Sequence, residues 1–294
     1  MEGVASRLAQ LFTSRFGGRA TIYTRFHTAT IMTQDKIKID LASARVESYA
    51  HPAALPTVQK SILKHDLYRR DFSINTLAVS LEPENFGHLI DFFSGRRDLS
   101  MGIVRILHNL SFIEDPTRII RAVRFEQRLG FKIADQTLRL IHSAIKHKVL
   151  KKVSTQRIQE ELLIMLNEKN PLKPLQRLHE LGILHQLPIS LVIDDRNMKI
   201  LEHINSFVQW YRMVYKDHTA SLWLTYLFGI LQGLTKAKVT QFFKIFAFTD
   251  KHRSLYHSTI RAIPIFQDHL AQNDLPNKIG RASCRERVTI QCRS

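Results

Sequence analysis

Two adjacent arginines followed by an aspartate are the first residues of this chain that could do chemistry. They are Arg69, Arg70 and Asp71, and they open the segment RRDFSIN. Guanidinium groups bind phosphate oxygens through paired hydrogen bonds, so these residues suit the phosphates of a nucleotide. The alternative is a surface ion pair at the start of a helix, with Asp71 near the positive end of the helix dipole.

A second group begins at Asp115, after which arginines recur every three residues at Arg118, Arg121 and Arg124. At about 100° per residue these side chains share one side of a predicted helix, and Arg128 extends the row. Such a row suits a phosphate chain or an RNA backbone. Asp115 with Arg118 could also hydrogen-bond the edge of a base. A solvated face of an amphipathic helix is the alternative.

A single carboxylate, Asp40 in the segment IDLASAR, is the third candidate. At the end of a predicted strand it could hold Mg²⁺, although one carboxylate does not make a metal site and a turn residue is the alternative. The 14 histidines offer no pair at metal-ligand spacing with a third partner. The sequence contains no glycine-rich phosphate loop of the common types.

The elements that must position these residues are predicted from hydrophobic periodicity and turn signals. In the first part we expect helices at 6–16 and 71–78, strands at 20–23, 28–32, 37–41, 79–81 and 88–91, and a loop at 47–64. From about residue 97 helices take over. The first, 111–129, has Ser111 and Glu114 as a capping box, Pro116 in its first turn and Gly130 as its stop. The others are expected at 135–147, 154–166, 172–184, 197–215, 220–231, 236–246 and 250–270.

The charge and composition narrow the class of protein. The 294 residues carry 43 Lys and Arg against 26 Asp and Glu, a net charge of +17, which favours a polyanionic partner such as nucleic acid or an anionic membrane surface. No apolar run reaches the roughly 18–20 residues of a membrane span, and no secretion signal is present. Cysteine is absent from residues 1–277, which fits a reducing compartment and excludes a disulfide scaffold.

The last segment, 278–294, reads KIGRASCRERVTIQCRS. It lacks apolar periodicity and resembles translated adapter sequence, so we interpret it as non-native and exclude it from the fold. A genuine basic tail is the alternative. Without this segment the rest of the chain is still strongly basic.

Four segments in this order resemble the bacterial class II tRNA nucleotidyltransferase and poly(A) polymerase family, whose members add CCA, or part of it, to tRNA 3′ ends. The segments are 39–45, DLYRRDFSINTLA at 66–78, LIDFFSGRRDL at 89–99 and ILHNLSFIEDPTRIIRAVRFEQRLGF at 106–131. The resemblance covers roughly residues 1–170 well, and the last segment looks most like members that add only the terminal A.

The resemblance implies an α+β protein, with a DNA-polymerase-β-like head containing a mixed sheet, then an all-α neck and body. The C-terminal part of the head is expected at residues 1–97, the neck at 98–166 and the body at 167–277. Arg70 and Asp71 would bind the nucleotide, with Arg70 on its phosphates. Asp115 and Arg118 would hydrogen-bond the incoming base, so that protein rather than nucleic acid acts as template.

The remaining implied roles are further nucleotide contacts for Arg121 and Arg124, RNA binding for Arg128 and Lys132, and a position near the third carboxylate of the head for Asp40. The family's Asp-x-Asp pair, which binds Mg²⁺ ions, is not in this sequence. We therefore expect a fragment that lacks the start of the head and is inactive alone. The implied partners are tRNA, ATP and CTP, in the cytoplasm, with no membrane.

Three other functions are compatible with the same composition. A poly(A) polymerase shares the motifs and differs in the length of its product. A non-catalytic basic helical module would bind RNA with a steep salt dependence and no need for nucleotide. A helical scaffold whose charge is incidental would bind neither RNA nor nucleotide.

Overall fold

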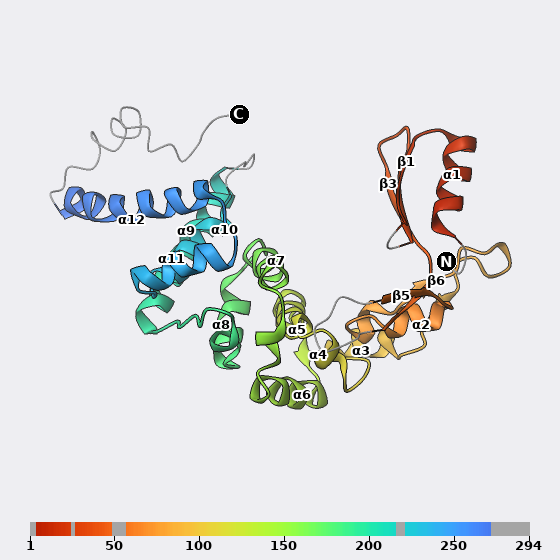
Figure 1. Cartoon of the computed structure of the whole chain (residues 1–294), viewed down its shortest axis with the longest axis horizontal. Helices are drawn as coiled ribbons and strands as arrows, with labels where there is room; N and C mark the ends of the chain where they lie inside the picture. The colour runs from red at the N-terminus through yellow and green to blue at the C-terminus, as the bar shows by residue number, and fades with distance from the viewer. Residues whose placement is uncertain (1–3, 25–26, 49–56, 216–220, 272–294) are drawn as a thin grey trace. The chain divides into compact units, whose positions relative to one another are not determined.

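A computed structural model describes residues 4–24, 27–48, 57–215 and 221–271 of the chain (Figure 1). The chain forms two compact units, Met1–Ser154 and Thr155–Ser294. The expected segment 278–294 lies outside the described residues. The boundary between the units falls inside the expected neck, and the four-part division stays a prediction.

The first unit opens with helix α1 (Ala5–Phe16) packed on an antiparallel sheet of β1 (Arg19–Tyr23), β2 (Thr28–Met32) and β3 (Lys38–Ala42), in that spatial order (Figure 1). Alternation buries Ala29 and Ile31 of β2 against Ala9 of α1, as the period of two requires. The link from α1 to β1 needs Gly18, because its φ is +94° and a Cβ there would lie 2.4 Å from the Met32 carbonyl oxygen.

The segment expected to be a loop at 47–64 contains regular structure where it is described. Strand β4 (Arg45–Ser48) pairs antiparallel with β5 (Thr57–Lys60), and helix α2 (Leu63–Tyr68) follows. The loop prediction is therefore wrong at both ends, while residues 49–56, which contain both of the prolines used to argue for it, lie outside the described part of the chain.

The helix expected at 71–78 is wrong. Only one 3₁₀ turn forms, η2 (Ser73–Asn75), because side chains compete for the backbone. The Asp71 carboxylate accepts the Phe72 N–H at 2.9 Å, and the Thr76 hydroxyl donates to the Ser73 carbonyl at 2.6 Å. The two strands expected next are confirmed as a short antiparallel pair, β6 (Ala78–Val79) and β7 (Leu89–Ile90), on either side of η3 (Pro83–Asn85).

Helix α3 (Gly95–Met101) packs on the η2 turn at close range. A Cβ on Gly95 would lie 2.3 Å from the Ser73 carbonyl oxygen, so only glycine allows this approach. The Ser73 hydroxyl donates to the buried Asp98 carboxylate at 2.6 Å, and Arg105 donates to the same group at 2.9 Å. Turn η2 is thereby held in one position.

The helix expected at 111–129 is divided into α4 (Ser111–Glu114) and α5 (Thr117–Leu129). Pro116 lies at the junction, and Asp115 caps α5 by accepting the Thr117 N–H at 3.0 Å. The capping box is wrong, because neither Ser111 nor Glu114 makes a side-chain cap. Gly130 ends α5 in a left-handed conformation, as predicted. Strand β8 (Ile103–Val104) pairs parallel with β9 (Lys132–Ile133), followed by α6 (Asp135–Lys146) and η4 (Val149–Lys152).

The described part of the second unit is helical, which confirms the α+β fold class with a helical C-terminal half (Figure 1). Its elements are α7 (Thr155–Leu166), α8 (Leu172–Glu180), η5 (Ile183–Gln186), α9 (Asp195–Val214), α10 (Trp223–Leu231), α11 (Lys236–Ile245) and α12 (Asp250–Ala271). No helix in the described residues is long and apolar enough to cross a membrane.

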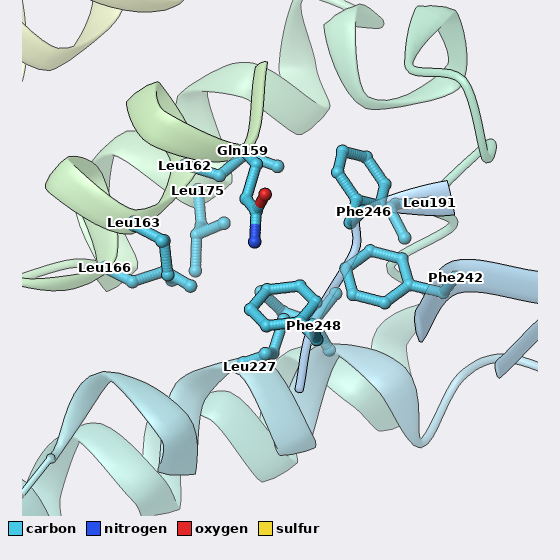
Figure 2. Close-up of a pocket in the computed structure, with 11 residues that line it drawn as sticks. Gln159, Leu162, Leu163, Leu166, Leu175, Leu191, Leu227, Phe242, Phe246 and Phe248 are labelled. Atoms are coloured by element: carbon cyan, nitrogen blue, oxygen red, sulfur yellow. The ribbon is translucent and has the colours of Figure 1, made fainter. Parts of the chain in front are cut away.

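An apolar pocket lies among α7, α8, α10 and α11 of the second unit (Figure 2). Leucine and phenylalanine side chains line it, and Gln159 is the one polar side chain in that lining. The pocket has no ionisable group, so we place the candidate site in the first unit.

Candidate nucleotide site

The two arginine-rich segments meet in space through Asp71 and Arg121. The Arg121 guanidinium on α5 donates to Asp71 Oδ2 from Nε at 2.9 Å and from Nη2 at 2.5 Å. Asp71 Oδ1 also accepts from the Asn75 amide at 2.7 Å. The Asp71 side chain is 8% exposed and that of Arg121 is 32% exposed. Residues 50 positions apart are therefore joined by one ion pair, which sequence reasoning did not predict.

This surrounding charge sets the ionisation of Asp71. Burial acts to raise the pKa of its carboxyl, but the Arg121 charge and hydrogen bonds from Asn75, Arg121 and the Phe72 N–H outweigh it. The pKa of Asp71 lies below its ordinary value, so the carboxylate is ionised at neutral pH. An ionised Asp71 holds the Arg121 guanidinium in place.

The two arginines of the first motif differ in exposure. Asp66 on α2 accepts from Arg69 Nη2 at 2.7 Å and lies 3.6 Å from Arg70 Nη2. Arg70 also donates to the Asn75 carbonyl at 3.1 Å, and its side chain is 44% exposed against 21% for Arg69. Arg70, the predicted phosphate contact, is thus the more exposed arginine of the pair. Asp66 was missed, although its spacing of three and four residues is the signal for contacts on one helix face.

Arg118 is buried at the junction of α4 and α5. Its guanidinium donates to the Ser111 hydroxyl at 2.6 Å and to the Arg69 carbonyl at 2.7 Å, and the residue is 4% exposed. Asp115, next to it, accepts the Thr117 N–H and hydroxyl. The predicted base-reading pair therefore lies at a helix start and is fixed by hydrogen bonds to two segments.

Glu114 and His108 extend this cluster and were not predicted. His108 Nε2 lies 3.4 Å from Glu114 Oε2, and Arg118 Nη1 lies 4.0 Å from the same oxygen. Burial lowers the pKa of the His108 imidazole, Glu114 acts in the opposite direction, and the Arg118 charge lowers it further. Because His108 lies in a loop, no periodic spacing could have marked it.

The expected open row of arginines on α5 is not observed. Arg118 and Arg124 are buried, while Arg128 is exposed and, like Arg124, lies over the Phe125 ring, at 4.8 and 5.2 Å. The physical reason is helix geometry: three residues advance by about 300°, so successive arginines step 60° round the helix and enter the packed side. The predicted RNA contacts Arg128 and Lys132 are both exposed.

Asp40 stands apart from this cluster. It lies on β3, its side chain is 63% exposed, and it accepts from the Thr30 hydroxyl at 2.7 Å and pairs with Lys38 at 3.0 Å. Its pKa is lowered by the hydrogen bonds from Thr30 and Lys38 and by the Lys38 charge. The described residues contain no group of three or more His, Cys, Asp or Glu side chains that could hold a metal ion. They do not by themselves fit the Mg²⁺ that the resemblance implies.

Comparison with known proteins gives the family. The "Poly A polymerase head domain" profile matches residues 1–105, and the "Probable RNA and SrmB-binding site of polymerase A" profile matches residues 130–190. A solved structure of a tRNA-processing enzyme in a complex superposes with a TM-score of 0.81 at 30% identity, covering 92% of this chain and 71% of that one. The chain belongs to the bacterial class II tRNA nucleotidyltransferase and poly(A) polymerase family.

Solved structures and curated relatives in this family match most of this chain. A CCA-adding enzyme in its apo form superposes with a TM-score of 0.82 at 32% identity, covering 92% of this chain and 64% of that one. The A-adding tRNA nucleotidyltransferase of Geobacter sulfurreducens is 43% identical over 234 residues, which are 80% of this chain and 27% of the relative. The enzyme of the same name from Aquifex aeolicus is 34% identical over 234 residues, 80% of this chain and 28% of its own length. The chain thus spans little more than a quarter of these two curated relatives.

Proposed function

We propose that this chain takes part in the transfer of a nucleotidyl group from ATP, or from ATP and CTP, to the 3′ end of tRNA. The observation that carries this is the joint between the two arginine motifs, made by the Asp71–Arg121 ion pair and the Arg118 bond to the Arg69 carbonyl. It joins the segment with the proposed phosphate contact to the segment with the proposed base-reading pair, which supports a site for one nucleotide. The relatives named as A-adding enzymes favour ATP. A tRNA substrate would place the protein in the cytoplasm.

In this proposal each predicted residue has a task that follows from its surroundings. Arg70 and the partly exposed Arg121 contact the nucleotide, with Arg70 on its phosphates. Arg124, the other predicted nucleotide contact, is buried against the Phe125 ring and supports this surface from within. Asp115 and Arg118 present an acceptor and a donor to the base edge. Asp71 keeps Arg121 in place, and Arg128 and Lys132 contact the RNA backbone.

Metal chemistry needs carboxylates that the described residues do not bring together. Members of this family generally use divalent metal ions, and Asp40 is the one carboxylate here that we assign to such a site. We therefore expect this chain alone, mixed with ATP, CTP, Mg²⁺ and tRNA lacking its 3′ end, to incorporate no nucleotide. Robust incorporation would overturn that expectation.

A chimera tests the proposed activity. The segment of the Geobacter sulfurreducens relative that aligns with this chain is replaced by this chain's residues, and radiolabelled ATP is supplied with tRNA ending in CC. The proposal predicts addition of one A, and a further chimera carrying Arg70→Ala should lose most of it. Absence of product from a folded chimera that still binds tRNA would contradict the assignment.

A poly(A) polymerase remains the second candidate, because the family profile that matches residues 1–105 is named for that enzyme. The same chimera separates the two functions. A ladder of many added A residues on RNA without a tRNA fold would favour the polymerase.

A further inference from the structure

Four aromatic rings from three separate segments form a continuous row in the first unit. Phe92 contacts Phe93 at 6.3 Å between ring centroids, Phe93 contacts Tyr68 at 5.6 Å, and Tyr68 contacts His108 at 5.1 Å. Tyr68 ends helix α2, the two phenylalanines follow β7, and His108 precedes α4. The row is thus built by tertiary structure and not by one amphipathic element.

The row is open to solvent along part of its length. Tyr68 is 45% exposed and Phe92 is 47% exposed. Exposed single aromatic residues are common on protein surfaces, but adjoining rings that leave their faces accessible are typical of surfaces that bind another molecule.

One end of the row lies beside a cation, and the other end adjoins the proposed base-reading pair. At the inner end His108 lies 3.4 Å from Glu114, which in turn approaches Arg118 of the proposed base-reading pair. At the outer end the Lys64 ammonium lies 5.9 Å from the centre of the Phe92 ring. Tyr68 is also adjacent in sequence to Arg69 and Arg70. The row therefore leads from a surface lysine to the nucleotide site.

We propose that Phe92, Phe93, Tyr68 and His108 form a stacking platform for the unpaired bases at the 3′ end of the RNA substrate. Every base has a π-face, so aromatic rings bind single-stranded ends whatever their sequence. The continuity with Arg118 and Asp115 favours this occupant, because the RNA end must lie next to the incoming nucleotide. The inference rests on the proposed function and adds to it the site that would hold the RNA end.

The test compares two RNAs that differ only in the unpaired end. Fluorescence anisotropy measures the affinity of the full chain for an acceptor-stem hairpin with three unpaired 3′ nucleotides and for the same hairpin with a blunt end. Stacking of one base is worth roughly a tenfold change in affinity. Tyr68→Ala should weaken binding of the overhang hairpin about tenfold and leave the blunt hairpin unchanged, whereas Tyr68→Phe, which keeps the ring, should bind like the wild type.

Tyr23 provides the matched control. It is 49% exposed, lies at the end of β1, and belongs to the same unit. Tyr23→Ala should leave both affinities unchanged. Circular dichroism checks that each variant is folded. If Tyr68→Ala unfolds, Phe92→Ala at the other exposed ring of the row gives the same test, since it too should weaken binding of the overhang hairpin and leave the blunt hairpin unchanged.

The outcomes separate the platform from the proposed function. Wild-type chain that binds the two hairpins equally well, or Tyr68→Ala that weakens both equally, would overturn the platform and leave the RNA-binding function intact. Wild-type chain that binds neither hairpin would reject both. A shift from dimer to monomer on Tyr68→Ala, seen by sedimentation, would assign the row to a second copy of the chain and overturn the proposal.

Discussion

At the scale of single residues, Asp71 is the group on which the site depends. It is 8% exposed and is bonded to Arg121, Asn75 and the Phe72 N–H. Asp71→Asn removes the negative charge that pairs with Arg121. Because Arg121 is partly exposed, water can replace part of the lost interaction. We expect the free energy of unfolding in urea to fall by about 1–3 kcal/mol. The exposed Asp40→Asn should change it by less than about 0.5 kcal/mol, and equal effects would contradict the assignment.

The pH dependence of stability follows from the same carboxylate. The pKa of Asp71 in the folded chain lies below its ordinary value of 3.8, so the unfolded chain takes up this proton first as the pH falls. The stability that Asp71 contributes is complete above the unfolded pKa and is lost as the pH falls through the folded pKa. Urea unfolding between about pH 5 and pH 3 should therefore show a shallower loss in Asp71→Asn than in the wild type. Parallel curves would show that Asp71 makes no such contribution.

Residue types and spacing predicted candidate residues but not their environment. Arg70, Asp115 and Arg118 were proposed from motif chemistry, and in the structure they lie near the point where two segments are bonded by Arg118 and the Arg69 carbonyl. The ion pair of Asp71 with Arg121 and the approach of His108 to Glu114 join positions far apart or in loops. No local pattern encodes such contacts, because they depend on how the elements pack.

At the scale of elements, the interruption between α4 and α5 is the feature that positions Asp115 and Arg118, the proposed base-reading pair. Periodicity predicted one continuous helix here. Instead the helix is interrupted at Asp115 and Pro116, and the Asp115 carboxylate caps α5 by accepting the Thr117 N–H. Asp115→Ala should destabilise the chain by about 1 kcal/mol, while Asp115→Asn, which keeps a capping oxygen, should cost little.

Measuring nucleotide selection should distinguish a base-reading role of Asp115 from a purely structural one. If Asp115 reads the base, Asp115→Asn should be as stable as the wild type and still lose discrimination between nucleotides, because an amide presents a different donor and acceptor pattern. In a catalytically competent chimera, we expect the choice of nucleotide to change more than the affinity for the triphosphate. Equal loss for every nucleotide would contradict the base-reading role.

Most elements with a clear apolar period were predicted. The helices of the second half follow apolar spacing closely, β1, β2 and β3 follow alternation, and even the short β6 and β7 were expected. The error at 71–78 arose because side-chain hydrogen bonds made by Asp71 and Thr76 compete with a helix. The β4–β5 pair was missed because prolines within 49–56 were interpreted as marking a loop.

At the scale of the whole molecule, the net charge is +17, and part of it comes from a group of exposed cations in the first unit. Five exposed cations, here called the α6–η4 cations, lie on α6, on η4 or between them, and buried Val149, Leu150 and Val153 anchor the backbone there. These cations are Arg139, Lys146, Lys148, Lys151 and Lys152.

The salt dependence of tRNA affinity tests whether the α6–η4 cations contact RNA. Each phosphate contact adds about 0.7–0.9 to the slope of log affinity against log salt concentration. If all four lysines of the α6–η4 cations contact phosphates, replacing them by glutamine should lower the slope for tRNA by about 3–3.5. The same change at four exposed lysines of the second unit, Lys236, Lys238, Lys244 and Lys251, should lower it less. Equal reductions would show that only total charge matters.

The most direct test of the account is equilibrium binding of the four ribonucleoside triphosphates to this chain, measured by calorimetry with and without Asp115→Asn. A protein template at Asp115 and Arg118 predicts that ATP, alone or with CTP, binds at least about tenfold more tightly than GTP and UTP, and that Asp115→Asn removes the difference. Equal affinities for all four nucleotides in the wild type, or selectivity that survives in Asp115→Asn, would contradict it.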